Sequence, residues 1–433
     1  MSARRFVLIS AATALSTAAV FAAFNVAVDP YLVFGMPRHA GFNALKPSAE
    51  THEWMMKAYQ APRINARTVV LGSSRTDIGF DPSSAAWPDS AQPVYNLSLA
   101  GAHTESSLRF LEHMLAVRGG EPVPKTLIVG LDFENFLIKP PQPQPQAAAE
   151  KHGPAPVDEV GERLAVLANG QPNPSRSLRV WKDYGASTLS LDAVIDSVQT
   201  LVANQRAGQA NVDDHGHLSE ARFTEWVKYD GVAALFEQKN ANTVRDLSIP
   251  RRSLSDRPGG DVKGFGAVHR LIAFAKLHRM TLLLSVQPAH AMRLELLDYM
   301  DYWQDYEHFK RGLTQIAAAA RADGVDVSLW DFGGYESYAS EAVPANKDRV
   351  ARLRWFWDPV HYTTALGDVM VATMLGQAGA DSYGVRLEPA TVEARLKQVR
   401  LDQQTYRQTR PEEVRRARQL LCTATACKTD KPA

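Results

Sequence analysis

The stretch Thr68-Val69-Val70-Leu71-Gly72-Ser73-Ser74-Arg75 decides how the rest of the chain is interpreted. Four β-prone residues run into a turn of small residues, as expected for a buried parallel strand. Ligands of open α/β sheets bind at the carboxyl ends of the strands. A serine in this turn is therefore placed to act as a nucleophile if a base can reach it. The sequence Asp358-Pro359-Val360-His361 could supply that base.

Runs of apolar residues alternate with helical patterns along most of the chain. Four further runs have the length and composition of buried strands, residues 93–97, 126–131, 281–286 and 325–330. Apolar residues also recur at helical spacing over residues 105–117, 268–277, 312–322 and 364–375. Strand, helix, strand at this pace is typical of βαβ units and a parallel sheet. We therefore expect an α/β domain over residues 60–378.

The alternation breaks between the third and fourth predicted strands. Residues 139–145 read Lys-Pro-Pro-Gln-Pro-Gln-Pro, which is typical of a polyproline spacer. Helical patches, such as residues 189–202, follow it with polar loops between them. We interpret residues 140–260 as an inserted, mainly helical region that caps one edge of the sheet. A tail over residues 387–433 is expected to contain two charged helices that are separated near Pro411.

The N-terminal stretch indicates a membrane anchor. Arg4 and Arg5 precede a charge-free run over residues 6–28, and a bilayer-spanning helix needs about 20 mostly apolar residues. The alternative is a cleaved signal peptide. Against it, the run exceeds an apolar signal region of about 7–15 residues, and no clear Ala-x-Ala site follows. The basic flank predicts a cytoplasmic amino terminus, so that the remaining chain leaves the cytoplasm.

The composition excludes some classes of protein and leaves one question open. A net charge of +1 without a long basic run gives no electrostatic footprint for nucleic acid. Cys422 and Cys427, the two cysteines, could close a short loop in an oxidising compartment or remain thiols. The sequence also lacks a phosphate-binding loop, a His-Glu-x-x-His zinc motif and a dinucleotide fingerprint after a strand. We therefore expect neither a cofactor nor a metal.

Nucleophilic serine catalysis needs a hydroxyl, a base held in one tautomer and donors for the oxyanion. Gly72-Ser73-Ser74 supplies hydroxyls at a tight turn, although such a sequence is also typical of a plain turn or a helix cap. It is not an α/β-hydrolase elbow, because Thr76 stands where Gly-x-Ser-x-Gly has its second glycine. Asp358 and His361 can pair within one turn; alternatively, Asp358 caps a helix and His361 is an ordinary histidine.

The order of these motifs resembles the SGNH (GDSL-like) hydrolase superfamily. Gly-x-Ser follows the first strand, Asn and Gly follow the second, Gly ends the third, and Asp-x-x-His precedes the last helix. Val-Leu-Gly-Ser-Ser-Arg-Thr looks like the divergent membrane-anchored branch, which includes proteins that act with bacterial cell-envelope polysaccharide O-acetylation. The resemblance spans residues 68–131 and 281–375 and leaves out the insertion and the tail.

The resemblance implies roles for single residues. The family's nucleophile corresponds to Ser74, the acid and base correspond to Asp358 and His361, and the second-block glycine that donates to the oxyanion corresponds to Gly101. Its usual aspartate before the nucleophile is Ser73 here.

The third block departs from the family's pattern. Gly130-Leu131-Asp132-Phe133 stands where the family has Gly-x-Asn-Asp, so Asp132 replaces the asparagine that donates to the oxyanion. An ionised carboxylate would repel an oxyanion. Asp132 would have to be protonated or displaced, with Asn135 as the substitute donor.

Residues near other predicted strand ends are secondary candidates. Arg75 could bind a substrate anion or pair with Asp77, and the pair is favoured. His290 and Asp331 could line the same cleft, or serve core and capping roles. Trp355 and Trp357 could stack on a sugar or pack against the core, as aromatic residues near a core helix usually do.

We therefore expect a three-layer, flavodoxin-like α/β domain with a helical insertion, anchored by one helix in a bacterial inner membrane and facing the periplasm. The expected function is a serine esterase or O-acyltransferase that acts on ester (acetyl) groups of an envelope glycan, with a membrane acyl-donor protein as a candidate partner. The alternative is a non-catalytic scaffold or glycan-binding protein of the same fold. Asp132 is the residue that favours this alternative.

Overall fold

A computed structural model describes residues 2–140, 159–206, 211–248, 250–255, 260–344, 348–377, 379 and 383–425. The chain forms two compact units. The N-terminal unit comprises Met1–Asn65, Arg109–Pro122 and Pro156–Ala221, and the sheet unit comprises Ala66–Leu108, Val123–Ala155 and Arg222–Ala433. The predicted insertion is thus divided between the two units, with boundaries after residues 155 and 221, and parts of it, such as residues 141–158, lie outside the described residues.

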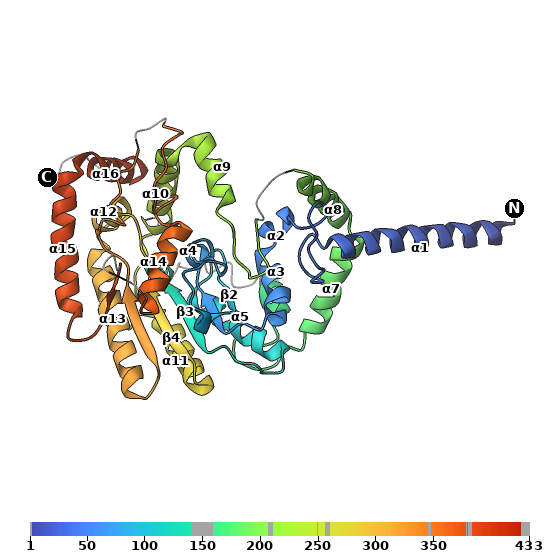
Figure 1. Cartoon of the computed structure of the whole chain (residues 1–433), viewed down its shortest axis with the longest axis horizontal. Helices are drawn as coiled ribbons and strands as arrows, with labels where there is room; N and C mark the ends of the chain where they lie inside the picture. The colour runs from blue at the N-terminus through green and yellow to red at the C-terminus, as the bar shows by residue number, and fades with distance from the viewer. Residues whose placement is uncertain are drawn as a thin grey trace, which may run out of the picture. The chain divides into compact units, whose positions relative to one another are not determined.

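The sheet unit is built on a six-stranded sheet in the order β2-β1-β3-β4-β5-β6. The first five strands are parallel and β6 is antiparallel to β5, which confirms the predicted α/β class with a mostly parallel sheet. The strands are β1 (Thr68–Leu71), β2 (Val94–Asn96), β3 (Thr126–Leu131), β4 (Thr281–Val286), β5 (Val327–Asp331) and β6 (Val385–Arg386) (Figure 1).

Burial explains which strands the sequence reveals. Every residue of β1 is buried, as are all but one residue of β4, so both strands are continuous apolar runs of the kind found in parallel sheets. In β3 only Thr126 and Gly130 are partly exposed. Strand β6 has two exposed residues and carries no apolar signal, and for that reason the sequence did not predict it.

Helices follow the strands of the sheet unit, and α5 (Thr104–Val117) is divided between the two units. The predicted helices occur, with α13 beginning nine residues before its predicted start and the tail helices meeting at Pro411. The helices that lie within the sheet unit, apart from the first residue of α9, are α4 (Ser74–Gly79), α9 (Ala221–Asp230), α10 (Val232–Ser248), α11 (Phe265–His278), α12 (Ala291–Tyr299), α13 (Trp303–Ala322), α14 (Thr364–Met374), α15 (Val392–Thr409) and α16 (Pro411–Thr425).

A close contact between α4 and α14 positions the candidate catalytic residues. A side chain at Gly367 of α14 would place its Cβ 1.7 Å from the Gly79 carbonyl oxygen of α4. A Cβ at Gly79 would in turn lie 1.9 Å from the Tyr362 ring. Asn96, at the end of β2, donates hydrogen bonds to the carbonyls of Thr76, Asp77 and Phe80 at the end of α4. The short helix that begins with Ser74 is thereby fixed against the helix that follows His361.

The N-terminal unit contains α1 (Ala3–Val28), which is long and apolar enough to cross a membrane by length and composition (Figure 1). The predicted anchor, residues 6–28, lies within it. The unit's other elements are α2 (Pro47–Thr51), α3 (Glu53–Gln60), η1 (Ala61–Arg63), α6 (Glu159–Arg163), α7 (Arg176–Leu189) and α8 (Leu191–Asn204). Buried Asp183 of α7 accepts hydrogen bonds from Tyr59, Arg163 and Arg179 and ties these elements together.

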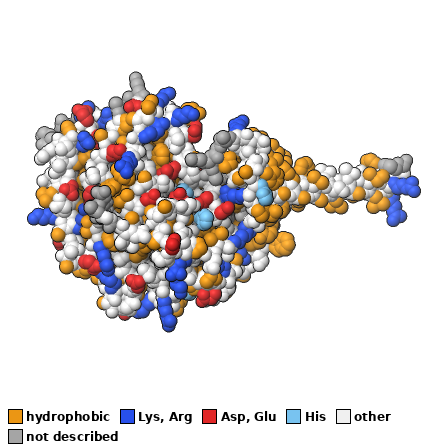
Figure 2. Space-filling model, in the orientation of Figure 1, with side chains coloured by type: hydrophobic (Ala, Val, Ile, Leu, Met, Phe, Trp, Pro, Cys, Tyr) orange, Lys and Arg blue, Asp and Glu red, His pale blue; other side chains and the backbone are white. Residues whose placement is uncertain are grey.

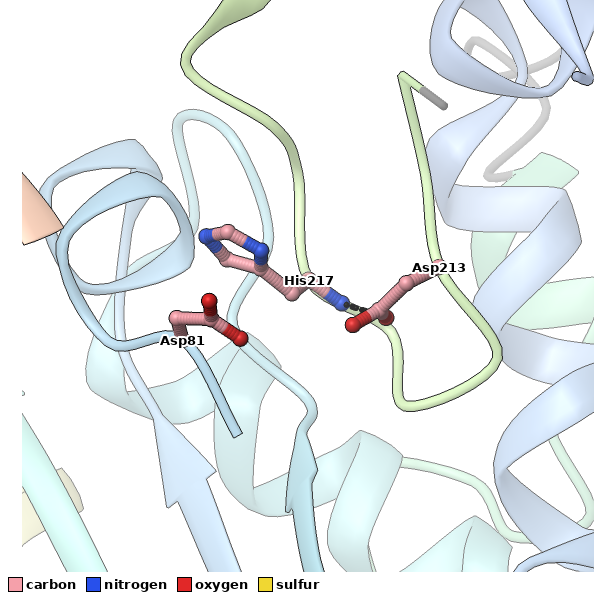
Figure 3. Close-up of side chains that lie close together, drawn as sticks. All are labelled: Asp81, Asp213 and His217. Atoms are coloured by element: carbon pink, nitrogen blue, oxygen red, sulfur yellow. Dashed lines mark hydrogen bonds between the residues drawn. The ribbon is translucent and has the colours of Figure 1, made fainter. Parts of the chain in front are cut away.

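The N-terminal unit also contains a turn that Asp213 closes. The Asp213 Oδ1 atom accepts a hydrogen bond of 2.8 Å from the backbone N–H of His217 (Figure 3). It accepts another of 2.8 Å from the backbone N–H of His215. Val212 and Leu218, both buried, flank the turn and form an isolated antiparallel bridge. The turn therefore has a structural role within the unit.

Candidate active site

Ser74 is the first residue of α4 and follows β1 after a two-residue turn. Gly72 has φ of +154°, and a Cβ there would lie 2.3 Å from Thr76 Oγ1, so a side chain at this position would be strained and would clash. Ser73 caps α4 through its hydroxyl, which accepts a hydrogen bond from the Arg75 N–H at 3.3 Å. The cap expected for one of the two serines therefore belongs to Ser73, and the Ser74 hydroxyl remains for other contacts.

The structure brings Ser74, His361 and Asp358 together. The Ser74 Oγ atom lies 2.8 Å from His361 Nε2, although the two residues are 287 positions apart. The His361 Nδ1 atom lies 2.6 Å from Asp358 Oδ2. Because a carboxylate accepts hydrogen bonds, Nδ1 carries the proton and Nε2 can accept the proton of the serine hydroxyl. This is the arrangement of a nucleophile, a base and an orienting acid.

Asp358 is held in place by its own loop. Its Oδ1 atom accepts hydrogen bonds from the backbone N–H groups of Val360 and His361, at 2.8 Å each, and leaves Oδ2 to the imidazole. The alternative in which Asp358 caps the following helix is wrong, because Thr363 is the N-cap residue of α14.

Burial and charge set the protonation states of this pair. Burial by itself raises the pKa of the Asp358 carboxyl, but attraction to His361, the hydrogen bond from the His361 ring and Lys239 lower that pKa to about 2. Burial lowers the pKa of His361 below its ordinary value of 6.5; Asp358 opposes this shift, and Lys239 and Arg75 add to it. At neutral pH the acid is thus ionised and the base is neutral, as general-base catalysis requires.

A pocket of about 490 Å³ opens beside these residues. Ser74, Asp358 and His361 line it together with Ala100, and α9 and α10 supply the rest of its wall. The wall residues from those two helices are Arg222, Phe223, Trp226, Asp230, Leu235, Gln238, Lys239 and Asn242. The volume falls in the range of small-molecule sites.

Aromatic side chains of α9 cover the histidine. The Phe223 ring centroid lies 5.2 Å from that of His361, and the ring stacks on Trp357 at 5.9 Å. Trp226 packs edge-on against Phe223 and is 45 % exposed. The Arg222 guanidinium lies 5.4 Å from the centroids of both α9 rings. Phe223 therefore desolvates His361, while Trp226 presents a ring to the solvent.

The predicted oxyanion residues occupy neighbouring loops. Gly101 is exposed, with φ of +74°, in a turn closed by the Ala102 N–H to Leu99 carbonyl hydrogen bond at 3.0 Å. Positive φ at this place in the turn explains the glycine. The Asn135 side-chain amide donates to the Ala102 carbonyl at 2.9 Å and lies 3.5 Å from Asp132 Oδ2. Asn135 thus connects the two loops, and its role as a substitute oxyanion donor stays a prediction.

Asp132 and Arg75 belong to a buried charge network. The Arg75 Nε atom lies 3.4 Å from Asp132 Oδ1, and Arg75 Nη2 lies 2.9 Å from Glu134 Oε2. Arg293 of α12 contacts the other oxygen of Glu134 at 2.8 Å. The Ser73 hydroxyl donates a short hydrogen bond to Asp132 Oδ2. Among the described residues, Arg75 forms its ion pairs with Asp132 and Glu134, in place of the predicted pair with Asp77.

The network fixes the charge of its members. Burial alone lowers the pKa of the Arg75 guanidinium, but Asp132 and Glu134 raise it above its ordinary value. Burial alone raises the pKa of Glu134, but Arg75 and Arg293 lower it below its ordinary range. A permanently charged arginine therefore offsets the charge of the Asp132 carboxylate.

Two predicted cleft residues serve the core instead. His290 caps α12 by accepting the Met292 N–H and contacts the Glu341 carbonyl at 2.8 Å. Asp331 is fully buried and pairs with Lys310 and Arg395. Neither residue is among those that line the pocket, as far as the described residues define it. Their interpretation as substrate-binding residues is corrected to the capping and core roles that were the alternative.

The two tryptophans beside the Asp-x-x-His sequence pack against the core. The Trp357 ring stacks on Phe223, and the Trp357 backbone N–H donates to the His361 carbonyl at 2.9 Å. The Trp355 ring packs against Tyr338. Both side chains border the hydrophobic core of the sheet unit.

Sequence reasoning missed several residues around the serine. Phe223, Trp226 and Lys239 fall in the region that carried no recognised motif, and only the fold brings them to the pocket. Glu134 could have been predicted as a site residue from the sequence, because it is a second acidic residue in the same loop, two positions after Asp132.

Comparison with known proteins adds no assignment, since no family model, no curated protein and no solved structure matches this chain.

Proposed function

We propose that this protein is a membrane-anchored, SGNH-type serine esterase or O-acyltransferase that acts on ester groups, chiefly acetyl groups of an envelope glycan. The observation that carries the proposal is the continuous hydrogen-bonded series from Ser74 through His361 to Asp358, with distances of 2.8 and 2.6 Å. It opens onto a pocket of suitable size. Nucleophile, base and orienting acid in hydrogen-bond contact are the signature of covalent acyl transfer.

In the proposed first half-reaction, Ser74 Oγ forms a bond to the acyl carbon while its proton passes to His361 Nε2. Asp358 stabilises the resulting imidazolium. The backbone amides of Ser74 and Gly101 receive the oxyanion. The tetrahedral intermediate then collapses, the ester C–O bond breaks, and His361 gives its proton to the departing alcohol oxygen.

In the second half-reaction, the acyl-serine reacts with water or with a sugar hydroxyl. His361 takes the proton of the attacking oxygen and returns a proton to Ser74 Oγ when the acyl–serine bond breaks. The same residues serve both outcomes, so the acceptor that reaches the pocket decides between hydrolysis and transfer.

The fold supports the family assignment. The order β2-β1-β3-β4-β5 of the parallel strands is that of flavodoxin-like, three-layer domains, in which ligands bind at the carboxyl ends of the strands. Ser74 follows β1 at such an end. The apolar helix α1 supports single-pass anchoring in a membrane. The SGNH resemblance adds an inner membrane, a periplasmic sheet unit and a membrane acyl-donor protein as the partner.

The pocket wall supports a carbohydrate substrate. Trp226 offers an exposed ring, while Gln238 and Asn242 offer amide groups for hydroxyl hydrogen bonds. An apolar wall with a few polar groups is typical of sites for small polar ligands.

The second candidate is a non-catalytic scaffold or glycan-binding protein of the envelope. Asp132 favours it, because a carboxylate stands where the family has an oxyanion donor. Arg75 offsets that charge, but its described contacts are with Asp132 and Glu134, and none of them directs a hydrogen-bond donor toward the oxyanion.

A kinetic comparison tests the proposal. The full chain in detergent is incubated with a chromogenic acetyl ester, with and without a sugar acceptor, alongside Ser74→Ala. We expect turnover by the wild type that Ser74→Ala loses, and acetylated sugar if the protein is a transferase. Equal rates for the two proteins would overturn the enzymatic function and favour the scaffold.

A further inference from the structure

Helix α7 presents large apolar side chains to its surroundings. Leu178, Trp181 and Leu189 lie on one face of the helix and are 61–73 % exposed. The residues of α7 that are buried are Asp183 and Ser187. This distribution is the reverse of that in a surface helix of a water-soluble protein, where apolar residues face the core.

Helix α8 repeats the reversed pattern. Leu191, Ile195, Val198 and Val202 recur at spacings of four and three residues and are 45–73 % exposed. Ala193, Ser197 and Thr200 are the buried residues of this helix. We call the exposed apolar residues of the two helices the α7–α8 stripe. An apolar stripe over two successive helices exceeds the scattered exposed apolar residues of ordinary surfaces.

The stripe adjoins the end of the membrane helix. Buried Asn25 of α1 donates a hydrogen bond to the Thr188 carbonyl of α7 at 2.9 Å and accepts one from the Ser197 hydroxyl of α8 at 2.8 Å. These bonds fix α7 and α8 to the last turn of α1 within the N-terminal unit. Figure 2 shows hydrophobic side chains gathered where α1 meets this unit.

The length of α1 sets the depth of this contact. Asn25 lies 22 residues after Ala3, which is about 33 Å along a helix. The hydrocarbon core of a bilayer is about 30 Å thick. Asn25 therefore reaches the boundary between hydrocarbon and headgroups when α1 spans the core. Leu189 and Leu191 follow Thr188 by one and three residues, so the α7–α8 turn lies at the same level.

We propose that the α7–α8 stripe lies in the interfacial layer of the bilayer that α1 enters. The N-terminal unit then contacts the lipid surface through α7 and α8 as well as through α1. Trp181 suits this layer, because indole rings concentrate at the membrane interface. Lys182, exposed beside it, can reach the headgroups. Helices that lie in this layer bury their apolar face at the acyl boundary.

A depth measurement on the full chain tests the stripe. Single cysteines are introduced as Leu189→Cys or Ile195→Cys in a background with Cys422→Ser and Cys427→Ser, and are labelled with an environment-sensitive fluorophore. The protein is reconstituted into phosphatidylcholine vesicles with or without lipids that carry a nitroxide near the headgroup. Leu15→Cys, in the middle of α1, reports whether the anchor has inserted. Leu277→Cys is the control, since Leu277 is a leucine of α11 in the sheet unit that is even more exposed than Leu189 and Ile195.

We expect emission at positions 189 and 195 to shift to shorter wavelength in vesicles and to be quenched by the shallow nitroxide, with no quenching at position 277. A shift to shorter wavelength at position 15, which shows that α1 has inserted, without quenching at 189 and 195 would overturn the proposal. A wavelength shift at 189 and 195 without lipid quenching would also overturn it and assign the stripe to a second copy of the chain. The readout does not depend on catalysis, so the proposed enzymatic function can fail independently.

Discussion

The Arg75 guanidinium lies 3.4 Å from the Asp132 carboxylate, on the loop where the SGNH resemblance places an oxyanion donor. The carboxylate is buried and also accepts a hydrogen bond from Ser73. The ion pair neutralises a charge that would repel an oxyanion, but an ion-paired carboxylate donates no hydrogen bond.

Asp132→Asn should therefore raise kcat/KM for an acetyl ester. The amide restores a donor and removes a negative charge, while Arg75 keeps its partner Glu134. One oxyanion donor is worth about 10²–10³ in rate, and we expect a gain on the order of tenfold because the loop was not built around the amide. Asp132→Ala removes the same charge without adding a donor and is the matched control. An equal gain in both variants would show that charge alone matters, and a loss in Asp132→Asn would contradict this role for the loop.

The pH dependence of acylation should reflect His361. The base must be neutral, and burial, with Lys239 and Arg75, holds its pKa below 6.5. The rate should therefore stay level as the pH falls to 6.5 and decline only at lower pH, where the folded protein binds the proton. Stopped-flow measurement of acyl-enzyme formation between about pH 4 and 8 follows this limb. A decline that begins above pH 6.5 would be inconsistent with a buried, neutral histidine.

Lys239→Met should move that decline to higher pH. Lys239 lowers the pKa of His361 through its positive charge, so its removal raises that pKa. Lys239→Arg keeps the charge and should leave the profile in place. The same pH titration on both variants makes the measurement, and an unchanged profile in Lys239→Met would show that the lysine does not influence the base.

Asp358→Asn should lower kcat by on the order of 10⁴, because the amide cannot hold Nδ1 protonated and Nε2 ready to accept a proton. Asp348→Asn is a matched control. Asp348 Oδ1 also accepts two backbone N–H bonds, from Val350 and Ala351, but Asp348 is exposed and has no histidine partner among its described contacts. Steady-state kinetics of both variants on an acetyl ester should separate the orienting role from the loop geometry. Similar activity in the two variants would rule out the orienting role.

Gly367→Ala should destabilise the sheet unit and displace Ser74. Its Cβ would lie 1.7 Å from the Gly79 carbonyl, and overpacking of this kind costs about 1–3 kcal/mol. Gly266→Ala in α11 is the control, since nothing lies within 4 Å of its Cβ and alanine favours helices. The thermal midpoint of the full chain in detergent should fall for Gly367→Ala and hold or rise for Gly266→Ala. Equal midpoints would show that α4 and α14 can move apart without cost.

The sequence was most informative where strands are buried on both faces. Residues 126–131 and 281–286 were predicted with the bounds of β3 and β4, because short continuous apolar runs of this kind are typical of strands that are buried on both faces. The pairing of Ser74 with His361 was predicted in another way, from the SGNH resemblance, because His361 lies in the loop before α14 and does not follow a strand. Strand β6 was missed because two exposed residues leave no pattern.

Side chains that depend on tertiary contacts were not predictable. His290 and Asp331 lie near strand ends like Ser74, yet one caps a helix and the other pairs with Lys310 and Arg395 deep in the core. Local sequence does not record the direction of a side chain after a strand. Phe223, conversely, comes from a helix far from any motif and reaches His361 only through the packing of α9.

Covalent labelling by a serine-directed fluorophosphonate, followed by peptide mapping, tests the central claim most directly. The account predicts that the reagent modifies Ser74 in the wild type, that Ser74→Ala is not labelled, and that Ser73→Ala, which loses only the cap and the contact with Asp132, still is. Unlabelled wild type, or labelling that survives in Ser74→Ala, would contradict it.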